Sequence, residues 1–267
     1  MDDTDQRVRR AEAGLRVFSR RVLEDGPDWV EDRSRPGVWA MSTPYPVAFL
    51  NGAAWARPDE VDVEVLVAEV VEDFASRGLP WSWSTTPGST SPALEDALRR
   101  AGLTESVEPL MHLELPTALP DLGAHEVVLG THADHEGLAA MAEAFGGPPD
   151  MVEVMATMQR CLRTGTELTA SVTDGQRVLG VAQGFPDDGV VVIANVAVRE
   201  EARGRGIGTA VTAAVLAAAQ ERGATDAVLV SSELGHSVYR GLGFVDVGTR
   251  STWEWVPPED EEPGPAP

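Results

Sequence analysis

Apolar residues recur along the chain with two periods, one typical of helices and one of strands. At residues 6–23 they return every three or four positions, as on one face of an amphipathic helix. At residues 111–115 they alternate with polar residues, as in a half-buried strand. Further helices are predicted at residues 60–77, 91–101, 131–145, 151–163, 204–222 and 237–242. Further strands are predicted at residues 38–42, 47–55, 79–84, 126–129, 167–173, 177–185, 189–198, 227–231 and 251–255.

This order of elements predicts an α+β fold built from two domains. Residues 116–123 hold two prolines and a glycine with little apolar periodicity, which is typical of a domain boundary. The predicted domains are residues 1–118 and residues 119–256, and the first repeats the order of the second in shortened form. Residues 257–267 are four acids, five prolines, a glycine and an alanine, a composition that predicts a disordered tail.

Composition and charge limit the partners that we expect for the chain. All 21 basic residues are arginine, and 43 acidic residues give a net charge of −22. Such an acidic surface repels nucleic-acid phosphates and anionic lipids, and it attracts a cationic substrate. No apolar run reaches the ~18–20 residues of a membrane span. We therefore expect no nucleic acid and no membrane as partner, and a cytoplasmic location.

A lone cysteine and a pair of histidines offer little chemistry. Cys161 excludes an internal disulfide, and its helical surroundings favour a buried thiol over a nucleophile. His132 and His135 could share a helix face, but no third ligand lies near them, so no metal site is expected. Several tryptophans concentrate in the first half and are expected to pack in its core. They are Trp29, Trp39, Trp55, Trp81 and Trp83.

The strongest chemical signal is the run Arg203–Thr209, which reads Arg-Gly-Arg-Gly-Ile-Gly-Thr and opens a predicted helix after a strand. Its glycines let backbone N–H groups converge at the positive end of the helix dipole, which favours anions. Arg203 and Arg205 add positive charge, so the expected guest is a diphosphate. The spacing fails the dinucleotide fingerprint G-x-G-x-x-G, and a P-loop would need a lysine. A nucleotide-dependent oxidoreductase is therefore disfavoured.

Two other motifs accompany this run. The pattern R-x-x-G-x-G, formed by Arg203, Gly206 and Gly208, follows the strand end Val196-Ala197-Val198. Further along, Tyr239–Phe244 reads Y-x-x-x-G-F. Together these motifs resemble the GNAT superfamily of acetyl-CoA-dependent N-acetyltransferases, and the resemblance runs from about residue 131 to residue 255. The two-part order is similar to that of tandem GNAT proteins, in which a degenerate first copy precedes an active second one.

The resemblance implies two GNAT-like domains, each a mixed, mostly antiparallel sheet flanked by helices. The second would transfer the acetyl group of acetyl-CoA to a primary amine of a small molecule or peptide, without a metal. Tyr239 is implied as the general acid for the leaving thiolate. One acetyl-CoA per chain is expected, because residues 1–118 contain no glycine-rich run. The implied cofactor-binding residues are Val196, Ala197, Val198, Arg203, Gly204, Arg205, Gly206, Ile207, Gly208, Thr209 and Ser232.

The general base is the main departure from the family pattern. Residues 189–198 contain no acid, and Asn195 is their only polar side chain. Three candidates for the base stay open: Glu233, His236 and a water chain. A non-catalytic acyl-CoA-binding module is the alternative function, although binding alone does not need the proton donor Tyr239. The motifs also leave open the acceptor amine, the use of other acyl groups and the formation of a homodimer.

Overall fold

The chain divides into two compact units. The computed structural model describes residues 3–120, 125–147, 150–161, 167–175 and 177–257. The larger unit is Met1–Asp28 with Glu108–Thr249, and the smaller unit is Trp29–Val107 with Arg250–Pro267. The chain passes between the units three times: between Asp28 and Trp29, and inside the two strands β5 (Thr104–Glu114) and β11 (Val245–Trp255). The compact units therefore divide the chain at other places than the predicted boundary between residues 118 and 119.

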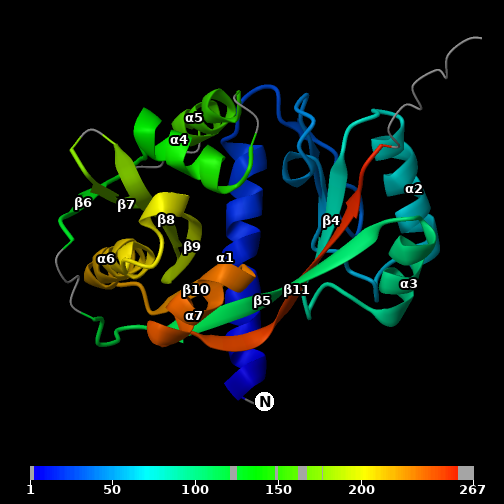
Figure 1. Ribbon diagram of the computed structural model, residues 1–267. Helices are drawn as coiled ribbons and strands as arrows, with labels where there is room; N and C mark the ends of the chain where they lie inside the picture. Colours follow the sequence, from blue (N-terminus) through cyan, green and yellow to red (C-terminus); the bar gives the residue numbers. More distant parts are fainter. Residues whose placement is uncertain (1–2, 121–124, 148–149, 162–166, 176, 258–267) are drawn as a thin grey trace, which may run out of the picture. The chain divides into compact units, whose positions relative to one another are not determined.

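The larger unit contains a sheet with helices packed on both faces (Figure 1). Its strands lie in the order β5–β10–β9–β8–β7–β6, and all neighbours are antiparallel except β9 and β10. Besides the shared strands, these are β6 (Val127–Gly130), β7 (Leu168–Thr173), β8 (Val178–Asp187), β9 (Val190–Val198) and β10 (Asp226–Val230). The helices are α1 (Asp3–Glu24), α4 (His135–Ala144), α5 (Met151–Cys161), α6 (Ile207–Glu221) and α7 (Glu233–Gly241), with a 3-10 turn at Glu200–Ala202.

Alternation along β8 assigns its neighbours to the two faces of this sheet. Ala182 packs in the cluster that contains α6, whereas Val181 packs with α4. Helix α1 lies on the same face as α4, where Ala11 packs with residues of β9 and β10. Gly180 and Gly184 face α6, and a Cβ at either position would lie within 2.5 Å of an α6 side chain. These two glycines therefore let α6 approach the sheet closely.

The strands of the smaller unit lie in the order β1–β2–β3–β4–β11, with β3 and β4 parallel and the other neighbours antiparallel. Its core is rich in aromatic residues: Trp81, Trp83 and Trp253 are almost fully buried, and Phe74 stacks on Trp81 at 5.0 Å. Besides β11, its elements are β1 (Glu31–Asp32), β2 (Trp39–Ser42), a 3-10 turn at Ala48–Leu50, β3 (Gly52–Ala54), α2 (Val63–Ala75), β4 (Trp81–Thr85) and α3 (Pro92–Arg100).

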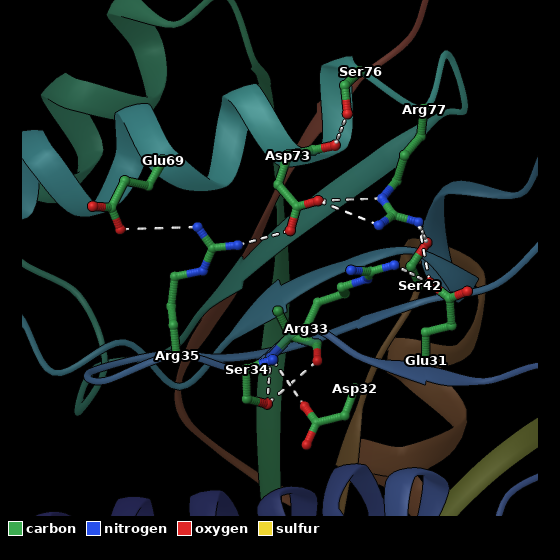
Figure 2. Close-up of polar contacts among 11 residues, drawn as sticks. Glu31, Asp32, Arg33, Ser34, Arg35, Ser42, Glu69, Asp73, Ser76 and Arg77 are labelled. Atoms are coloured by element: carbon green, nitrogen blue, oxygen red, sulfur yellow. Dashed lines mark hydrogen bonds and ion pairs between the residues drawn. The ribbon is translucent and has the colours of Figure 1, made fainter.

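Paired charges join α2 to the first strands of the smaller unit (Figure 2). Arg35 binds Asp73 of α2 at 2.7 Å. Arg77 reaches the same Asp73 at 3.3 Å and Glu31 of β1 at 3.3 Å. Glu31 also pairs with Arg33, and these arginines together lower the pKa of the Glu31 carboxyl, mainly through the hydrogen bond from Arg33. The arginines of this network are thus matched to carboxylates.

Most predicted elements are confirmed, including the α+β architecture. Helix α3, predicted from residue 91, starts at Pro92 because the hydroxyl of Ser91 caps it. Two other helix starts differ from prediction. α4 begins at His135 because Asp134, not Thr131, accepts the capping hydrogen bond from the backbone. α7 begins at Glu233 instead of residue 237 because the hydroxyl of Ser232 caps it. In each case a short polar side chain next to the helix competes successfully for the free N–H groups.

Strand lengths and a few side chains complete the comparison with the sequence. The predicted strand at residues 47–55 is interrupted by the turn Ala48–Leu50, and β5 and β11 are longer than predicted. Trp81 and Trp83 pack in the core as expected. The side chain of Cys161 and the tail residues 258–267 lie outside the described part of the chain, so their predicted burial and disorder stay predictions.

Candidate functional site

The C-terminal half of β9 leaves the regular sheet. β9 pairs with the parallel strand β10 only from Val190 to Val192 within the described strands. On the other side, the register with β8 shifts between Val181 and Gln183, so that Asn195 and Val196 together face a single residue of β8. This is a β-bulge, and Asn195 adopts the left-handed conformation with φ 53°. The backbone of β9 beyond Val192 therefore has an edge that β10 does not cover.

Three of the residues that the resemblance implies as cofactor-binding lie at this uncovered end of β9. Val196 lies in the bulge, Ala197 pairs with Val181 of β8, and Val198 pairs with Gly180. The carbonyl oxygen of Val198 accepts a hydrogen bond of 3.3 Å from Nε of Arg203. The end of β9 and the arginine run after it are thus in direct contact.

Helix α6 begins without a side-chain cap. Gly206 stands at its N-cap position with φ 78°, and Gly204 is also left-handed at 74°. The first hydrogen bond along the helix runs from the N–H of Ala210 to the oxygen of Gly206, at 3.0 Å. Within the described part of the chain, the N–H groups of Ile207, Gly208 and Thr209 donate no hydrogen bond, as is usual for the first turn of a helix. By contrast, side chains cap α2, α3, α4 and α7.

The backbone conformation of Gly208, the last glycine of the motif, does not require glycine. Gly208 lies inside the first turn of α6, and a Cβ there would meet Val198 at an ordinary contact distance of 3.6 Å. Its backbone is therefore compatible with a side chain, unlike Gly204 and Gly206. Because Gly208 has no side chain, a ligand can come close to the backbone N–H groups in the first turn of α6.

The two arginines of the run contact only backbone oxygens within the described residues. Arg203 binds the oxygen of Val198, and Arg205 binds the oxygen of Glu201 at 2.7 Å. Neither forms an ion pair with a carboxylate in the part of the chain that the structure describes, although the chain is strongly acidic. His125 also contacts this loop, because its Nε2 lies 2.8 Å from the backbone oxygen of Arg205.

Tyr239 of α7 is buried against the core of the larger unit. Only 8% of it is exposed, and its ring meets Phe244 edge-on at 6.0 Å between centroids. A Cβ on Gly235 would come within 2.7 Å of the tyrosine ring, so the glycine makes room for it. Burial raises the pKa of the Tyr239 hydroxyl to about 12. The phenol is therefore protonated at neutral pH, and it is a weaker acid than an exposed tyrosine.

The other predicted residues of α7 have structural contacts. The hydroxyl of Ser232 accepts a 3.3 Å hydrogen bond from the N–H of Gly235 and so serves as the helix cap. Glu233 is exposed in the first turn. Nε2 of His236 lies 2.9 Å from Asp246, which also pairs with Arg240 at 3.7 Å. The base therefore stays open between Glu233, His236 and water.

A chain of amide side chains beside the bulge escaped the sequence analysis. Asn195 donates to Gln183 of β8 at 2.7 Å, and Gln183 donates to Gln159 of α5 at 3.0 Å. A sequence signal existed for Gln183, which is a polar residue at an inward position of an otherwise apolar strand. No pattern connects Gln159 with it, because the two meet only through the tertiary fold.

A separate cavity of about 280 Å³ lies at the start of β10, under the N-terminal turns of α1. It is lined by Arg7, Arg10, His112 and Asp226, among others. Nε2 of His112 lies 2.7 Å from Asp226, which also pairs with Arg10.

Among the described residues no cluster of three or more His, Cys, Asp or Glu side chains forms a metal site, and none of the helices described there has the length and apolarity to cross a membrane.

Part of the chain, which includes the end of β9 and the open start of α6, is similar to a known protein family. Residues 135–244 match the model of the Acetyltransferase (GNAT) family. A search of curated proteins found no match.

Three solved structures illustrate the likeness. A GCN5-related N-acetyltransferase from Kribbella flavida matches 90% of this chain and 95% of its own, with a TM-score of 0.66 and 21% identity. One from Sphaerobacter thermophilus matches 90% of both chains, with a TM-score of 0.60 and 18% identity. A tandem GNAT protein from the clavulanic acid biosynthesis pathway matches 97% of both chains, with a TM-score of 0.58 and 14% identity. The chain therefore has the GNAT fold, and residues 135–244 carry the sequence pattern of that family.

Proposed function

We propose that the larger unit is an acetyl-CoA-dependent N-acetyltransferase that acts on a primary amine. One observation carries the proposal: the uncapped start of α6, with its two arginines, directly follows the uncovered end of β9. A ligand that combines a diphosphate with an extended amide-containing arm needs such an anion site next to a free strand edge. When bound, acetyl-CoA would supply an activated acetyl thioester.

The residues of the α6 start divide the binding of the diphosphate between them. The N–H groups of Ile207, Gly208 and Thr209 would donate to its oxygens, at the positive end of the helix dipole. Arg203 and Arg205 would add charge-assisted hydrogen bonds, because carboxylates do not occupy them within the described residues. Gly204 and Gly206 give the loop its left-handed turns.

The end of β9 would hold the arm of the cofactor and stabilise the charge that develops in the reaction. Backbone groups of Val196, Ala197 and Val198 would pair with the arm as a neighbouring strand does. The N–H of Val196, in the bulge, is our candidate donor to the carbonyl oxygen as it gains negative charge. Ser232 contributes less than the resemblance implied, since its hydroxyl already caps α7.

Tyr239 would act on the sulfur as that atom leaves. A thiol has an ordinary pKa of about 8.5, well below the value of about 12 to which burial raises Tyr239. Complete proton transfer from this phenol to the thiolate is therefore uphill. We propose that Tyr239 stabilises the developing thiolate mainly by donating a hydrogen bond, and that its proton is replaced from solvent if it is lost.

The smaller unit would not bind a second acetyl-CoA. Its helices α2 and α3 start with the side-chain caps Asp62 and Ser91, which occupy the N–H groups that an anion would need. We propose that this unit descends from a degenerate GNAT copy, in the arrangement of the tandem GNAT protein to which the chain is similar.

The direct test is turnover of acetyl-CoA with primary amines, followed by the release of free thiol. The panel would hold putrescine, spermidine, tyramine, glucosamine and a lysine-containing peptide. We expect at least one amine to be acetylated, with a kcat/KM that falls as salt is added, because the net charge of −22 attracts a cation. Binding of acetyl-CoA without thiol release for any amine would contradict the proposed activity and favour a binding module.

A further inference from the structure

Four polar groups form one continuous chain from α5 to the bulge of β9. The backbone N–H of Ala133 donates to Oε1 of Gln159 at 2.9 Å, and Nε2 of Gln159 donates to the oxygen of Ala133 at 2.8 Å. Nε2 of Gln183 donates to Oε1 of Gln159 at 3.0 Å. Nδ2 of Asn195 donates to Oε1 of Gln183 at 2.7 Å.

The backbone of Ala133 fixes the direction of this chain. A peptide N–H can only donate and a carbonyl oxygen can only accept, so the two bonds with Ala133 allow Gln159 a single orientation. Oε1 of Gln159 can then receive only the amide nitrogen of Gln183. The same reasoning leaves Oε1 of Gln183 for the amide nitrogen of Asn195. The chain therefore ends in an acceptor, Oδ1 of Asn195.

The surroundings make this terminal oxygen a good acceptor. Gln183 is only 5% exposed, and each amide that donates toward α5 polarises the next one. Within the described residues Oδ1 of Asn195 receives no hydrogen bond, and the residue is half-buried in the bulge next to Val196. β9 carries no carboxylate, so this amide oxygen is its strongest side-chain acceptor.

The amide chain also lies on the face of the sheet opposite to α6. Gln183 alternates with Ala182 and Gly184, which face α6, and it contacts α5 instead. A cofactor held at the start of α6 and a substrate held at Asn195 would thus come to the bulge from opposite faces.

We propose that Oδ1 of Asn195 binds an N–H of the acceptor amine and orients the nitrogen lone pair toward the acyl carbon, an inference that rests on the proposed function. The site takes a neutral primary amine as its hydrogen-bond donor, because an ammonium group has no lone pair to attack the acyl carbon. An amine that arrives protonated must lose that proton first. An amide oxygen does not remove the proton, so Asn195 positions the amine and the proton leaves to solvent or to another base.

The test is Asn195→Gly, measured with the best amine of the panel. Glycine adopts φ 53° without strain, so the variant removes the amide and keeps the bulge. We expect kcat/KM for the amine to fall about 10- to 100-fold, with an unchanged Kd for acetyl-CoA. Asn195→Asp keeps an acceptor oxygen and tolerates the same backbone, and we expect it to retain kcat/KM within about tenfold.

Asp188→Gly is the matched control, because Asp188 is another non-glycine residue with positive φ, 43°, in the turn before β9. It should leave both constants unchanged. If Asn195→Gly keeps kcat/KM within twofold of the wild type, Asn195 serves only the backbone and the inference is wrong while the proposed function stands. If the wild type acetylates no amine, both fail together.

Discussion

The two ends of the strand pair β9 and β10 are built in opposite ways. At the start of β10 every oxygen of the buried Asp226 is matched: His112 and Thr225 each bind it at 2.7 Å, and Arg10 of α1 pairs with it. At the other end β9 leaves β10, bulges at Asn195 and is followed by a helix without a cap. The hydrogen bonds of Asp226 at the start of β10 stabilise the fold. The other end of the strand pair has backbone N–H groups that we propose bind a ligand.

Arginines show the same contrast. In the smaller unit Arg35 and Arg77 are held by Asp73, whereas Arg203 and Arg205 touch only backbone oxygens in the described chain. A chain with 43 acidic and 21 basic residues can easily match each arginine with a carboxylate. The anion site that we propose would account for these two arginines, which lie next to a helix start without a side-chain cap.

The largest effect is expected from Gly206→Glu. The variant forces a side chain into a backbone with φ 78° and puts a negative charge where the diphosphate would bind. Calorimetric titration should show no measurable binding of acetyl-CoA. Gly223→Glu is the control, because Gly223 ends the same helix with φ 88° and open space around it. An equal loss of acetyl-CoA binding in the two variants would mean that backbone strain or added charge, and not the position of Gly206, explains the effect.

Tyr239→Phe should have the next largest effect. The phenyl ring keeps the contact with Phe244, so the melting temperature should change little. We expect kcat to fall about 10²-fold, at the lower end of the range for a proton donor, because the raised pKa limits Tyr239 to hydrogen bonding. Steady-state kinetics with a fixed amine provide the measurement, and Tyr45→Phe is the matched loss of a hydroxyl in the smaller unit.

The pH dependence of the same reaction sharpens this role. With a pKa of about 12, Tyr239 keeps its proton throughout the neutral and moderately alkaline range. The wild-type kcat should therefore show no fall near pH 10 that is absent in Tyr239→Phe. A fall with a midpoint near 10, lost in the variant, would show that the hydroxyl is solvated and not buried.

Asp226→Asn tests the start of β10, where the buried carboxylate is hydrogen-bonded on both oxygens. Burial raises the pKa of the Asp226 carboxyl, but hydrogen bonds from Thr225 and His112 and the charge of Arg10 outweigh it, so the net shift is downward. A lowered pKa stabilises the fold above the ordinary carboxyl value, and the gain is lost as the pH falls through the folded pKa. We expect the variant to lose about 1–3 kcal/mol at pH 7, and this difference to shrink below about pH 4. Urea unfolding at both pH values measures it, and acetyl-CoA binding at pH 7 should persist.

Two smaller effects should distinguish an arginine of the proposed binding site, Arg205, from an arginine that stabilises the fold, Arg77. Arg205→Ala should weaken acetyl-CoA binding about threefold to tenfold and leave stability unchanged, since no carboxylate in the described chain depends on it. Arg77→Ala should cost about 0.5–1 kcal/mol of stability, because it breaks contacts with Asp73 and Glu31, and leave binding unchanged. If Arg205→Ala and Arg77→Ala changed acetyl-CoA binding and stability in the same proportion, the proposed difference between ligand-binding and structural arginines would be wrong.

The sequence was informative where one short segment determines the outcome. The glycine-rich run predicts a helix start with converging N–H groups. In the structure Gly204 and Gly206 precede α6 in the left-handed conformation that few other residues adopt. The bulge at Asn195 depends on the register with β8, and the amide chain depends on contacts between α5, β8 and β9. The division into units could not be predicted either, because β5 and β11 each contribute to both. Such features arise from pairing between distant segments, which local patterns do not encode.

The most direct test of the account is the stoichiometry of acetyl-CoA binding to the full chain, measured by calorimetric titration. Helix α6 has an uncapped start next to two arginines that meet no carboxylate within the described residues, whereas α2 and α3 of the smaller unit are capped by Asp62 and Ser91. We expect one acetyl-CoA per chain, with binding lost in Gly206→Glu. Two sites per chain, or full binding by that variant, would contradict it.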